Sequence, residues 1–390
     1  MKRTSKTVYA AVLAVGVTFS AVSAYSTVSQ ASVQSPQSDP SIQLDKTKIK
    51  NKTHSNKLKS LSHDKKATSD YLNSLDTKGL LETAAEYSEG TDDVFNEGVA
   101  LIAPTLISKT KNGTHAKQLD QLVKDKSNNK KYRLFLIDLH SQQKNEDQGD
   151  LINDTLMNVA ADKTEDPDVR SYALGELKKD SKEDKVKKTK KDKALVDLFS
   201  DDTTPDKIKG NALTAMRRTE NPHLSEAVKS VIDKHEQKDS TLLRHAIIAG
   251  SKSRVYSDVK KIKTIASTTS DPKVYASSVY GLGLLSNEEA LKAVLEIKDK
   301  HNNRDIVHYA LISNQKLILN LLANDQSKDS LLTAVQAAEV STLHSALDKL
   351  QEIARNNPDK EVRDKAEQAI KTINATPKSS VPSNAEKWED

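Results

Sequence analysis

The chain has 390 residues, no cysteine and 4% aromatic residues, and it is poor in glycine (11) and proline (10). An all-β fold needs many turns and many aromatic or β-branched residues, so this composition argues against one and favours amphipathic helices. The formal net charge is +5, but Lys2, Arg3 and Lys6 supply three of those charges, which leaves the rest of the chain nearly balanced. A balanced surface lacks the basic footprint of a nucleic-acid-binding protein, so we expect no nucleic-acid partner.

Residues 1–31 have the organisation of an export signal. A basic stretch, Met1–Lys6, precedes an apolar stretch, Val8–Phe19, and small residues suited to cleavage end at Ala24 and Ala31. The alternative is an uncleaved membrane anchor, but an apolar stretch of 12 residues is short of the roughly 20 that a spanning helix needs. We therefore predict a cleaved secretory signal, a secreted or cell-surface protein, and no stable membrane insertion after cleavage.

Three regions follow the signal. Residues 32–70 are polar and poor in large apolar side chains, which predicts a mostly disordered spacer. From Tyr71 to about Asn374 the apolar residues recur with a helical period. Residues 375–390 contain Pro377 and Pro382 among polar residues, and we expect them to form a flexible C-terminal tail.

One segment recurs within 71–374. Its clearest copy, Asp166–Leu177, joins an Asp-Pro pair to an apolar anchor, a small residue four positions later and an apolar residue eight positions later. The anchors of the clear copies are Val169, Ile208, Leu242, Val274, Ile306 and Val362, and weaker copies start at Val94 and Tyr132. Spacings of 39, 34, 32 and 32 residues separate the first five anchors, and the 56 residues from 306 to 362 leave room for two short units.

The recurring pattern has a direct physical meaning. Asp-Pro supplies a helix cap and a proline in the first turn. An N–H at that position would have no partner within the helix, so the missing N–H of proline costs nothing there. The anchor, the small residue and the second apolar residue share one helix face, and the small residue lets a neighbouring helix approach closely. Amphipathic segments between the copies, such as Leu224–Ile232 and Ala290–Ile297, predict a second helix in each unit. We expect successive pairs to stack as a repeat array, with a non-repetitive helical bundle as the alternative.

The motif Asp-Pro-x-Val-Arg-x-x-Ala-x-x-x-Leu at 166–177 resembles a HEAT-type repeat, closest to the short HEAT-like repeats of the phycobilisome-lyase type. The resemblance covers 166–374 and extends weakly over 71–165. It implies an all-α, right-handed α-solenoid of helix pairs, in which Asp and Arg side chains of successive repeats form a ladder. Arg170 and Arg363 keep the ladder arginine, and Lys209 is a conservative replacement. Three central copies depart from it, with Leu243, Tyr275 and Val307.

Patterns for catalysis or metal binding are missing from the sequence. The ten histidines are scattered with no two four residues apart, and the favoured interpretation is that they face solvent. The motifs of serine hydrolases, phosphate-binding loops and dinucleotide sites are absent, and Asn145–Asp150 lacks the ligand spacing of a calcium loop. We therefore predict no enzymatic activity, no cofactor and no metal.

The predicted function is that of a non-catalytic scaffold that presents a concave helical surface to a protein or peptide. The HEAT resemblance implies that the Asp-Pro-capped helices line this face, and Tyr and Arg are the residue types that most often dominate protein interfaces. The alternative is that the tyrosines pack between repeats, with their hydroxyls at the rim. The candidate partner-binding residues are Tyr172, Asn211, Arg244, His245, Tyr275, His308 and Tyr309.

The lysine-rich segment Lys178–Lys193 supports a second hypothesis. It contains nine lysines and four acidic residues, and its densest run is Lys187, Lys188, Lys190 and Lys191. The functional interpretation is a patch for cell-wall polymer or another anionic polymer, whereas the favoured one is a long solvated loop between two repeats. A third hypothesis, a lyase-like enzyme or enzyme accessory, rests on fold analogy alone.

Overall fold

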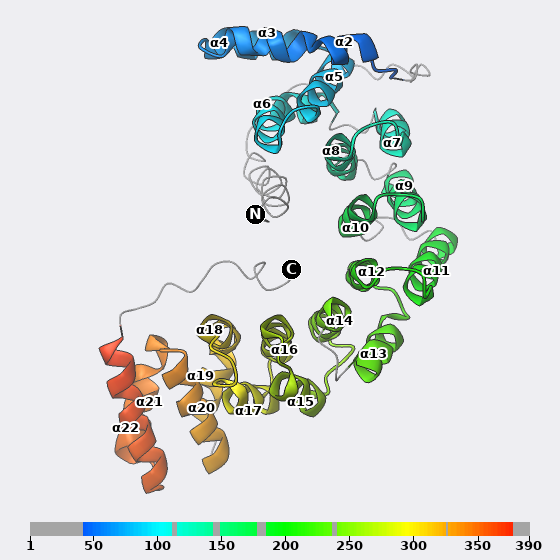
Figure 1. Ribbon diagram of the computed structural model, residues 1–390. Helices are drawn as coiled ribbons and strands as arrows, with labels where there is room; N and C mark the ends of the chain where they lie inside the picture. Colours follow the sequence, from blue (N-terminus) through cyan, green and yellow to red (C-terminus); the bar gives the residue numbers. More distant parts are fainter. Residues whose placement is uncertain are drawn as a thin grey trace. The chain divides into compact units, whose positions relative to one another are not determined.

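The computed structural model describes residues 42–110, 115–142, 149–177, 185–235, 240–324 and 327–376. Regular structure in these ranges is entirely helical, with 21 α-helices, one short 3-10 helix and no strand, which confirms the predicted all-α class (Figure 1). The chain divides into two compact units, Met1–Lys191 and Asp192–Asp390, called unit 1 and unit 2 below. The predicted signal and residues 377–390 of the predicted tail lie outside the described residues.

Unit 1 begins with an arm of three short helices, α2 (Lys46–Asn51), α3 (Thr53–Leu61) and α4 (Lys65–Ser74). In Figure 1 the arm runs crosswise to helices α7–α10 of the same unit, which are seen almost end-on. The prediction of a disordered spacer over 32–70 is therefore wrong for the described residues from 46 onward. Part of the reason is local, because the side chains of Asp45 and Asp64 accept N–H bonds at the starts of α2 and α4.

The larger reason is a pair of buried carboxylates that hold the arm. Glu82 and Glu86 of helix α5 (Thr77–Ser88) are 1% and 2% exposed. The Asp45 N–H donates to Glu82 Oε1 at 2.8 Å, and the N–H groups of His54 and Ser55 donate to Glu86 at 3.1 and 2.6 Å. These bonds satisfy N–H groups near helix starts, which have no partner inside their own helix. The acceptors lie 31 to 37 positions away in the sequence, so composition does not reveal them.

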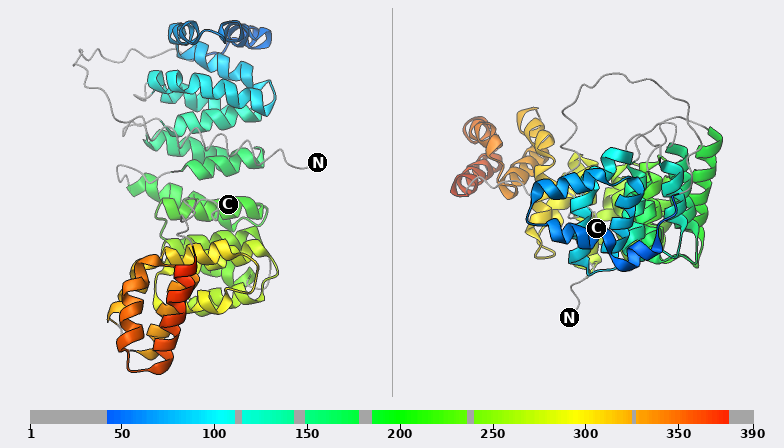
Figure 2. Two further views of the ribbon diagram at one scale, coloured as in Figure 1. Left: turned by 90° about the vertical axis from the view of Figure 1, so that its left-hand side faces the viewer. Right: turned by 90° about the horizontal axis from the view of Figure 1, so that it is seen from above.

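The rest of unit 1 consists largely of stacked helix pairs. α7 packs on α8 and α9 on α10, while α8 also contacts α10 and α7 contacts α9, so the pairs form two layers. The left view of Figure 2 shows these helices one above another. α6 packs mainly on α5. The bounds are α6 (Asp92–Thr110), α7 (Ala116–Lys124), α8 (Lys130–Ser141), α9 (Gly149–Ala161), α10 (Pro167–Glu176) and α11 (Lys185–Ser200), the last of which continues into unit 2.

Unit 2 continues the same plan. Helices α12, α14, α16 and α18 pack side by side in sequence order and form an inner layer, against which α13, α15 and α17 are packed. α20 contacts both α18 and α22, within the interval between Ile306 and Val362 that leaves room for two short units. The bounds are α12 (Asp206–Arg218), α13 (Leu224–His235), α14 (Thr241–Lys252), α15 (Val259–Thr268), α16 (Pro272–Leu285), α17 (Glu288–Ile297), α18 (Arg304–Ile312), α19 (Gln315–Asn324), α20 (Lys328–Val340), α21 (Leu347–Asn356) and α22 (Lys360–Ala375).

The predicted apolar anchors explain why these helices stack. The six clear anchors are all buried, and so are the small residues four positions later, from Ala173 to Ala366. The weaker anchor Tyr132 is also buried, on α8. Val94 is 36% exposed, so its assignment as an anchor is wrong, and Phe95 beside it faces the core instead. The predicted Asp caps are confirmed at Asp166 and Asp271, whose side chains accept N–H bonds in the first turns of α10 and α16.

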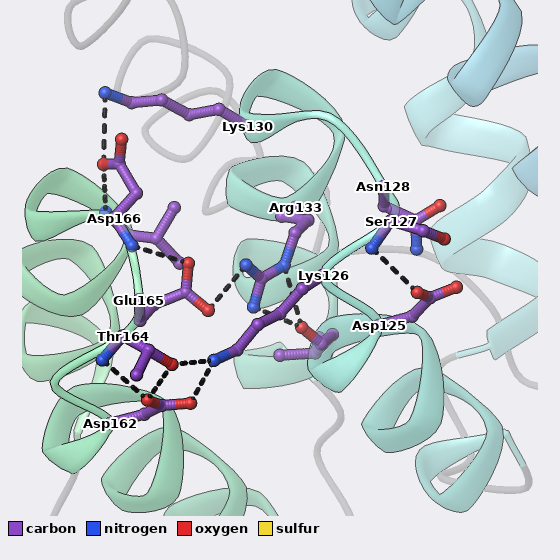
Figure 3. Close-up of polar contacts among 12 residues, drawn as sticks. Asp125, Lys126, Ser127, Asn128, Lys130, Arg133, Asp162, Thr164, Glu165 and Asp166 are labelled. Atoms are coloured by element: carbon purple, nitrogen blue, oxygen red, sulfur yellow. Dashed lines mark hydrogen bonds and ion pairs between the residues drawn. The ribbon is translucent and has the colours of Figure 1, made fainter.

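A polar network joins the successive repeats of unit 1 (Figure 3). Arg133 on α8 donates through Nε and an Nη to the Val123 carbonyl at 3.1 and 2.8 Å, and its other Nη lies 2.6 Å from Glu165 of the next repeat. Arg170 occupies the same place one repeat later and donates to the Ala160 carbonyl at 2.8 Å, again ten residues back. Arg133 therefore occupies the position in its repeat that Arg170 occupies in the next one, although the predicted arginine ladder did not include it.

Candidate functional site

The predicted partner-binding residues are distributed over both units. Tyr172 lies on α10 in unit 1, and it is half-buried. The remaining six lie on the inner-layer helices α12, α14, α16 and α18 of unit 2. Asn211 and His308 are half-buried there, and burial lowers the pKa of the His308 imidazole although Asp305 opposes the shift.

Tyr275 was wrongly placed on an open surface. It is fully buried, its hydroxyl donates to the Ile297 carbonyl at 3.0 Å, and its ring centroid is 4.7 Å from that of His301. Burial, followed by the charge of Asp299, raises the pKa of the Tyr275 hydroxyl to about 12. The position that an arginine holds in other repeats is occupied here by a tyrosine that faces inward, toward the C-terminal end of α17.

Three other members of the predicted row make contacts between neighbouring inner helices. The His245 ring lies against Gly210 of α12, and its Nδ1 is 3.4 Å from the Thr214 hydroxyl. Arg244 Nε donates to the Ser277 hydroxyl at 3.3 Å, and the ring centroids of Tyr309 and Tyr280 are 5.8 Å apart. Burial, followed by the charge of Arg244, lowers the pKa of His245 to about 4. These side chains join repeats, which is the role that the alternative interpretation assigned to the tyrosines.

The lysine-rich segment is helical where the structure describes it, so the expectation of a loop is wrong from Lys185 onward. Consecutive lysines have a high helix propensity, and the apolar face from Leu195 to Leu198 anchors the same helix. Lys190 is exposed and Lys188 half-buried, but Lys191 is only 7% exposed, so it is not available to a polymer. The side chain of Lys187 and residues 178–184 lie outside the described residues.

Several histidines do not face solvent as expected. His140 on α8 is fully buried, and His54 on α3 is nearly so. Burial lowers the pKa of His140 to about 4, Lys124 adds to the shift and Asp120 opposes it. Among the described residues no three His, Cys, Asp or Glu side chains converge as metal ligands would.

A groove in unit 1 with a mixed apolar and polar lining is the surface that the sequence did not predict. It lies between the arm helices α3 and α4 and the helix α6, and it encloses about 560 Å³. Its lining is Leu58, Lys59, Ser62, Lys65, Thr68, Ser69, Leu72, Tyr87, Val94, Glu97, Gly98, Leu101 and Thr105.

The α6 wall of the groove exposes two large apolar side chains to solvent. Val94 and Leu101 are 36% and 39% exposed, and among the described residues only Val255 in unit 2 is a comparably exposed large apolar side chain. Positions 94, 98, 101 and 105 follow each other at helical spacing, so they share one face of α6. Two of the three exposed large apolar side chains among the described residues therefore line the same cavity.

The floor of the groove depends on a glycine. A Cβ at Gly98 would lie 2.2 Å from Cγ of Tyr87, so only glycine lets the Tyr87 ring lie against the backbone of α6. Leu58 and Leu72 from the arm complete an apolar floor, and both are buried. Burial, followed by Glu86 and Glu97, raises the pKa of the Tyr87 hydroxyl.

Two independent contacts hold the arm wall of the groove in place. Glu82 and Glu86 bind backbone N–H groups of the arm, as described above. At the other end, Lys109 Nζ of α6 donates to the Asn73 carbonyl at 2.9 Å and also to the Leu75 carbonyl. The arm wall is thus fastened to α5 and to α6 through hydrogen bonds of residues that do not line the cavity.

The rims of the groove carry opposite charges. Lys59 and Lys65 are exposed on the arm side, whereas Glu97 and its neighbour Asp93, one helical turn earlier, are exposed on the α6 side. This arrangement can bind an apolar surface that carries both signs of charge at its edges. Val94, Gly98 and Leu101 at helical spacing were the available sequence signal, but it was interpreted as a weak repeat copy.

The fold and the groove together define an all-α protein of stacked helix pairs with a groove beside its N-terminal arm. No protein-family model matches the chain, and no curated protein matches it either. None of the described helices is both long and apolar enough to cross a membrane.

Proposed function

We propose that this chain is a non-catalytic helical-repeat scaffold that binds a protein partner, and that the groove between the arm and α6 is its binding surface. The observation that carries the proposal is the pair Val94 and Leu101, which leave apolar area open beside a cavity of about 560 Å³. Solvent-exposed apolar patches next to polar rims are typical of protein interaction sites. The row on α12–α18 is a weaker candidate because several of its side chains already contact residues of neighbouring helices within the stack.

We also propose that the scaffold is exported and HEAT-like. The basic and apolar stretches of residues 1–31 support export. The Asp-capped inner helices and the recurring arginine contacts of Arg133 and Arg170 support the resemblance to HEAT repeats. Right-handedness of the solenoid remains a prediction of that resemblance.

Site-specific photocrosslinking tests the binding surface. A photoreactive amino acid replaces Leu101 in one version of the full chain and Val255 in another, because these side chains are 39% and 38% exposed and only Leu101 lines the groove. Each version is expressed in the cells that make the protein, and the products are identified by mass spectrometry. We expect one defined protein partner crosslinked through position 101 and absent at position 255.

Equal products at both positions would sink the groove assignment, as would crosslinks to polymer alone. The cell-wall alternative is tested in parallel with Lys188→Gln and Lys190→Gln, which remove two of the lysines of the predicted patch. Wall association that is lost in this variant while the Leu101 crosslink is absent would favour the polymer-binding hypothesis.

A further inference from the structure

We propose that the occupant of the groove is an amphipathic α-helix of the partner, with an apolar stripe flanked by basic residues on one side and acidic residues on the other. This inference rests on the proposed protein-binding function and specifies the class of partner. Its basis is the shape, the backbone chemistry and the charge of the groove.

The backbone chemistry favours a helix over an extended peptide. An extended segment leaves its N–H and C=O groups free and usually satisfies them on the edge of a sheet. The described residues contain no strand, so the groove walls offer no such edge. A helix satisfies its own backbone and needs only side-chain contacts from the groove.

The dimensions favour a helix that lies in the mouth of the groove. The cavity of about 560 Å³ can receive the inward-facing side chains of a helix that lies in its mouth. Val94 and Leu101 stand seven residues apart on α6, which matches a partner stripe with the same helical spacing.

The rims then determine which flanks the partner helix needs. A basic flank fits beside Asp93 and Glu97, and an acidic flank fits beside Lys59 and Lys65. Turning the helix end for end exchanges its two flanks, so the opposite rims select one of the two directions of binding. These charges are exposed, so they contribute mainly to specificity and to association rate, and salt weakens their effect.

Three labelled peptides of about 18 residues test the charge requirement. All carry the same leucine stripe, and they differ in having one Glu flank and one Lys flank, two Lys flanks, or two Glu flanks. Fluorescence anisotropy with the full chain measures their affinities. We expect the mixed peptide to bind about tenfold more tightly than either of the others at low salt, with a smaller difference at about 0.5 M salt.

Variants of the protein locate the binding. Leu101→Glu places a charge in the apolar wall, and we expect it to weaken binding of the mixed peptide at least about tenfold. Val255→Glu is the matched control, with a similarly exposed side chain outside the groove. The double variant Lys59→Glu, Lys65→Glu makes both rims acidic, so the preference should shift to the peptide with two Lys flanks. Circular dichroism confirms that each variant folds.

Two results would overturn the inference. One is equal binding of all three peptides with no response to Leu101→Glu. The other is binding of a fatty acid in the groove, detected by its displacement of an apolar dye, with no binding of any peptide. If the peptides fail while position 101 still crosslinks a protein, the scaffold function stands and only the helical occupant is wrong; if both fail, the groove has no role in binding.

Discussion

Units 1 and 2 stack helix pairs in the same way, but the α8–α10 junction of unit 1 and the α14–α18 junctions of unit 2 are made with different chemistry. In unit 1 the α8–α10 junction is charged: Arg133 is paired with Glu165 at 2.6 Å, and Lys126 with Asp162 at 2.5 Å. The Lys126 and Thr164 hydrogen bonds hold the pKa of Asp162 well below its usual range. In unit 2 the α14–α16 and α16–α18 junctions depend on close packing, whereas the α20–α22 junction is charged, with Lys328 3.0 Å from Asp359 and 2.7 Å from Glu361.

Glycines in the inner helices of unit 2 make that close packing. A Cβ at Gly281 would lie 2.8 Å from Cγ2 of Ile247 on the preceding inner helix, and one at Gly283 would lie 3.0 Å from the Cα of Ala310 on the following one. Where unit 1 has an arginine, α16 has Tyr275, whose hydroxyl binds a carbonyl at the end of α17. In each case a side chain of an inner-layer helix donates to a carbonyl near the C-terminal end of a helix in the other layer. The last carbonyls of a helix have no partner within that helix, so these bonds satisfy them.

One turn is shared by both units and shows that the repeat plan itself is common. The loop before an inner helix contains an Asp whose side chain accepts the N–H of a hydroxyl residue two positions on, at 2.9 Å for Ser127, 2.9 Å for Thr164 and 3.0 Å for Thr203. Such turns order a loop without long-range partners. The same Asp turn thus precedes α8, α10 and α12, while the side chains that join neighbouring inner helices differ between α8–α10 and α14–α18. We expect the α8–α10 junction to be sensitive to charge and the α12–α18 junctions to be sensitive to side-chain volume.

The largest expected effect is the loss of the buried charge pair in unit 1. Both side chains of Arg133 and Glu165 are only 4% exposed, so Glu165→Gln leaves a buried guanidinium without its counter-charge. We expect a loss of about 3–5 kcal/mol in the unfolding free energy of α8–α10. Hydrogen exchange with mass spectrometry measures it, because peptides from the two units are resolved.

The matched control is the exposed pair Lys263 and Glu296 in unit 2, at 2.5 Å with side chains 38% and 44% exposed. Glu296→Gln should cost less than about 1 kcal/mol, because water screens the pair. Similar costs for both variants would contradict the view that unit 1 depends on buried charge.

The second-largest effect on stability is expected from the pH dependence of unit 1. His140 titrates at about 4 when folded and near 6.5 when unfolded, so between these pH values the unfolded chain binds more protons. Its contribution is fully present above about pH 6.5 and is lost as the pH falls toward 4, at a cost of about 3 kcal/mol. His140→Leu should flatten this part of the stability profile of α8, measured by hydrogen exchange. A stability profile that is unaltered by His140→Leu would rule this account out.

The third-largest effect on stability is expected from added side-chain volume at the glycines of the inner helices. In unit 2, a Cβ at Gly210 would lie 2.5 Å from Cδ2 of His245, so Gly210→Ala should cost about 1–3 kcal/mol. In unit 1, a Cβ at Gly175 would meet no atom within 4 Å, so Gly175→Ala should stabilise α10 by up to about 1 kcal/mol through helix propensity. Urea unfolding followed by hydrogen exchange compares the two. Stabilisation by both variants would mean that the α12–α14 junction has room to spare.

The sequence was sufficient for the features that depend on local patterns. Periodic anchors such as Ile208 and Val274, and Asp caps such as Asp271, depend on neighbouring residues, and the structure bears them out. The ordered arm was missed because its partners, Glu82 and Glu86, are distant in sequence. The groove was missed for a related reason: whether Val94 is buried depends on whether another helix covers α6, and no local pattern reports that.

The smallest effect separates packing from partner binding at Tyr275. Because its hydroxyl donates to the Ile297 carbonyl at 3.0 Å inside the stack, Tyr275→Phe should lower the unfolding free energy of unit 2 by about 1 kcal/mol. The ring remains, so the van der Waals contacts with the neighbouring helices persist and the fold survives. Crosslinking of a partner through position 101 should be unchanged in this variant. If Tyr275→Phe instead left stability intact and abolished partner capture, the hydroxyl would belong to an interface, and the row on the inner helices of unit 2 would replace the groove as the binding surface.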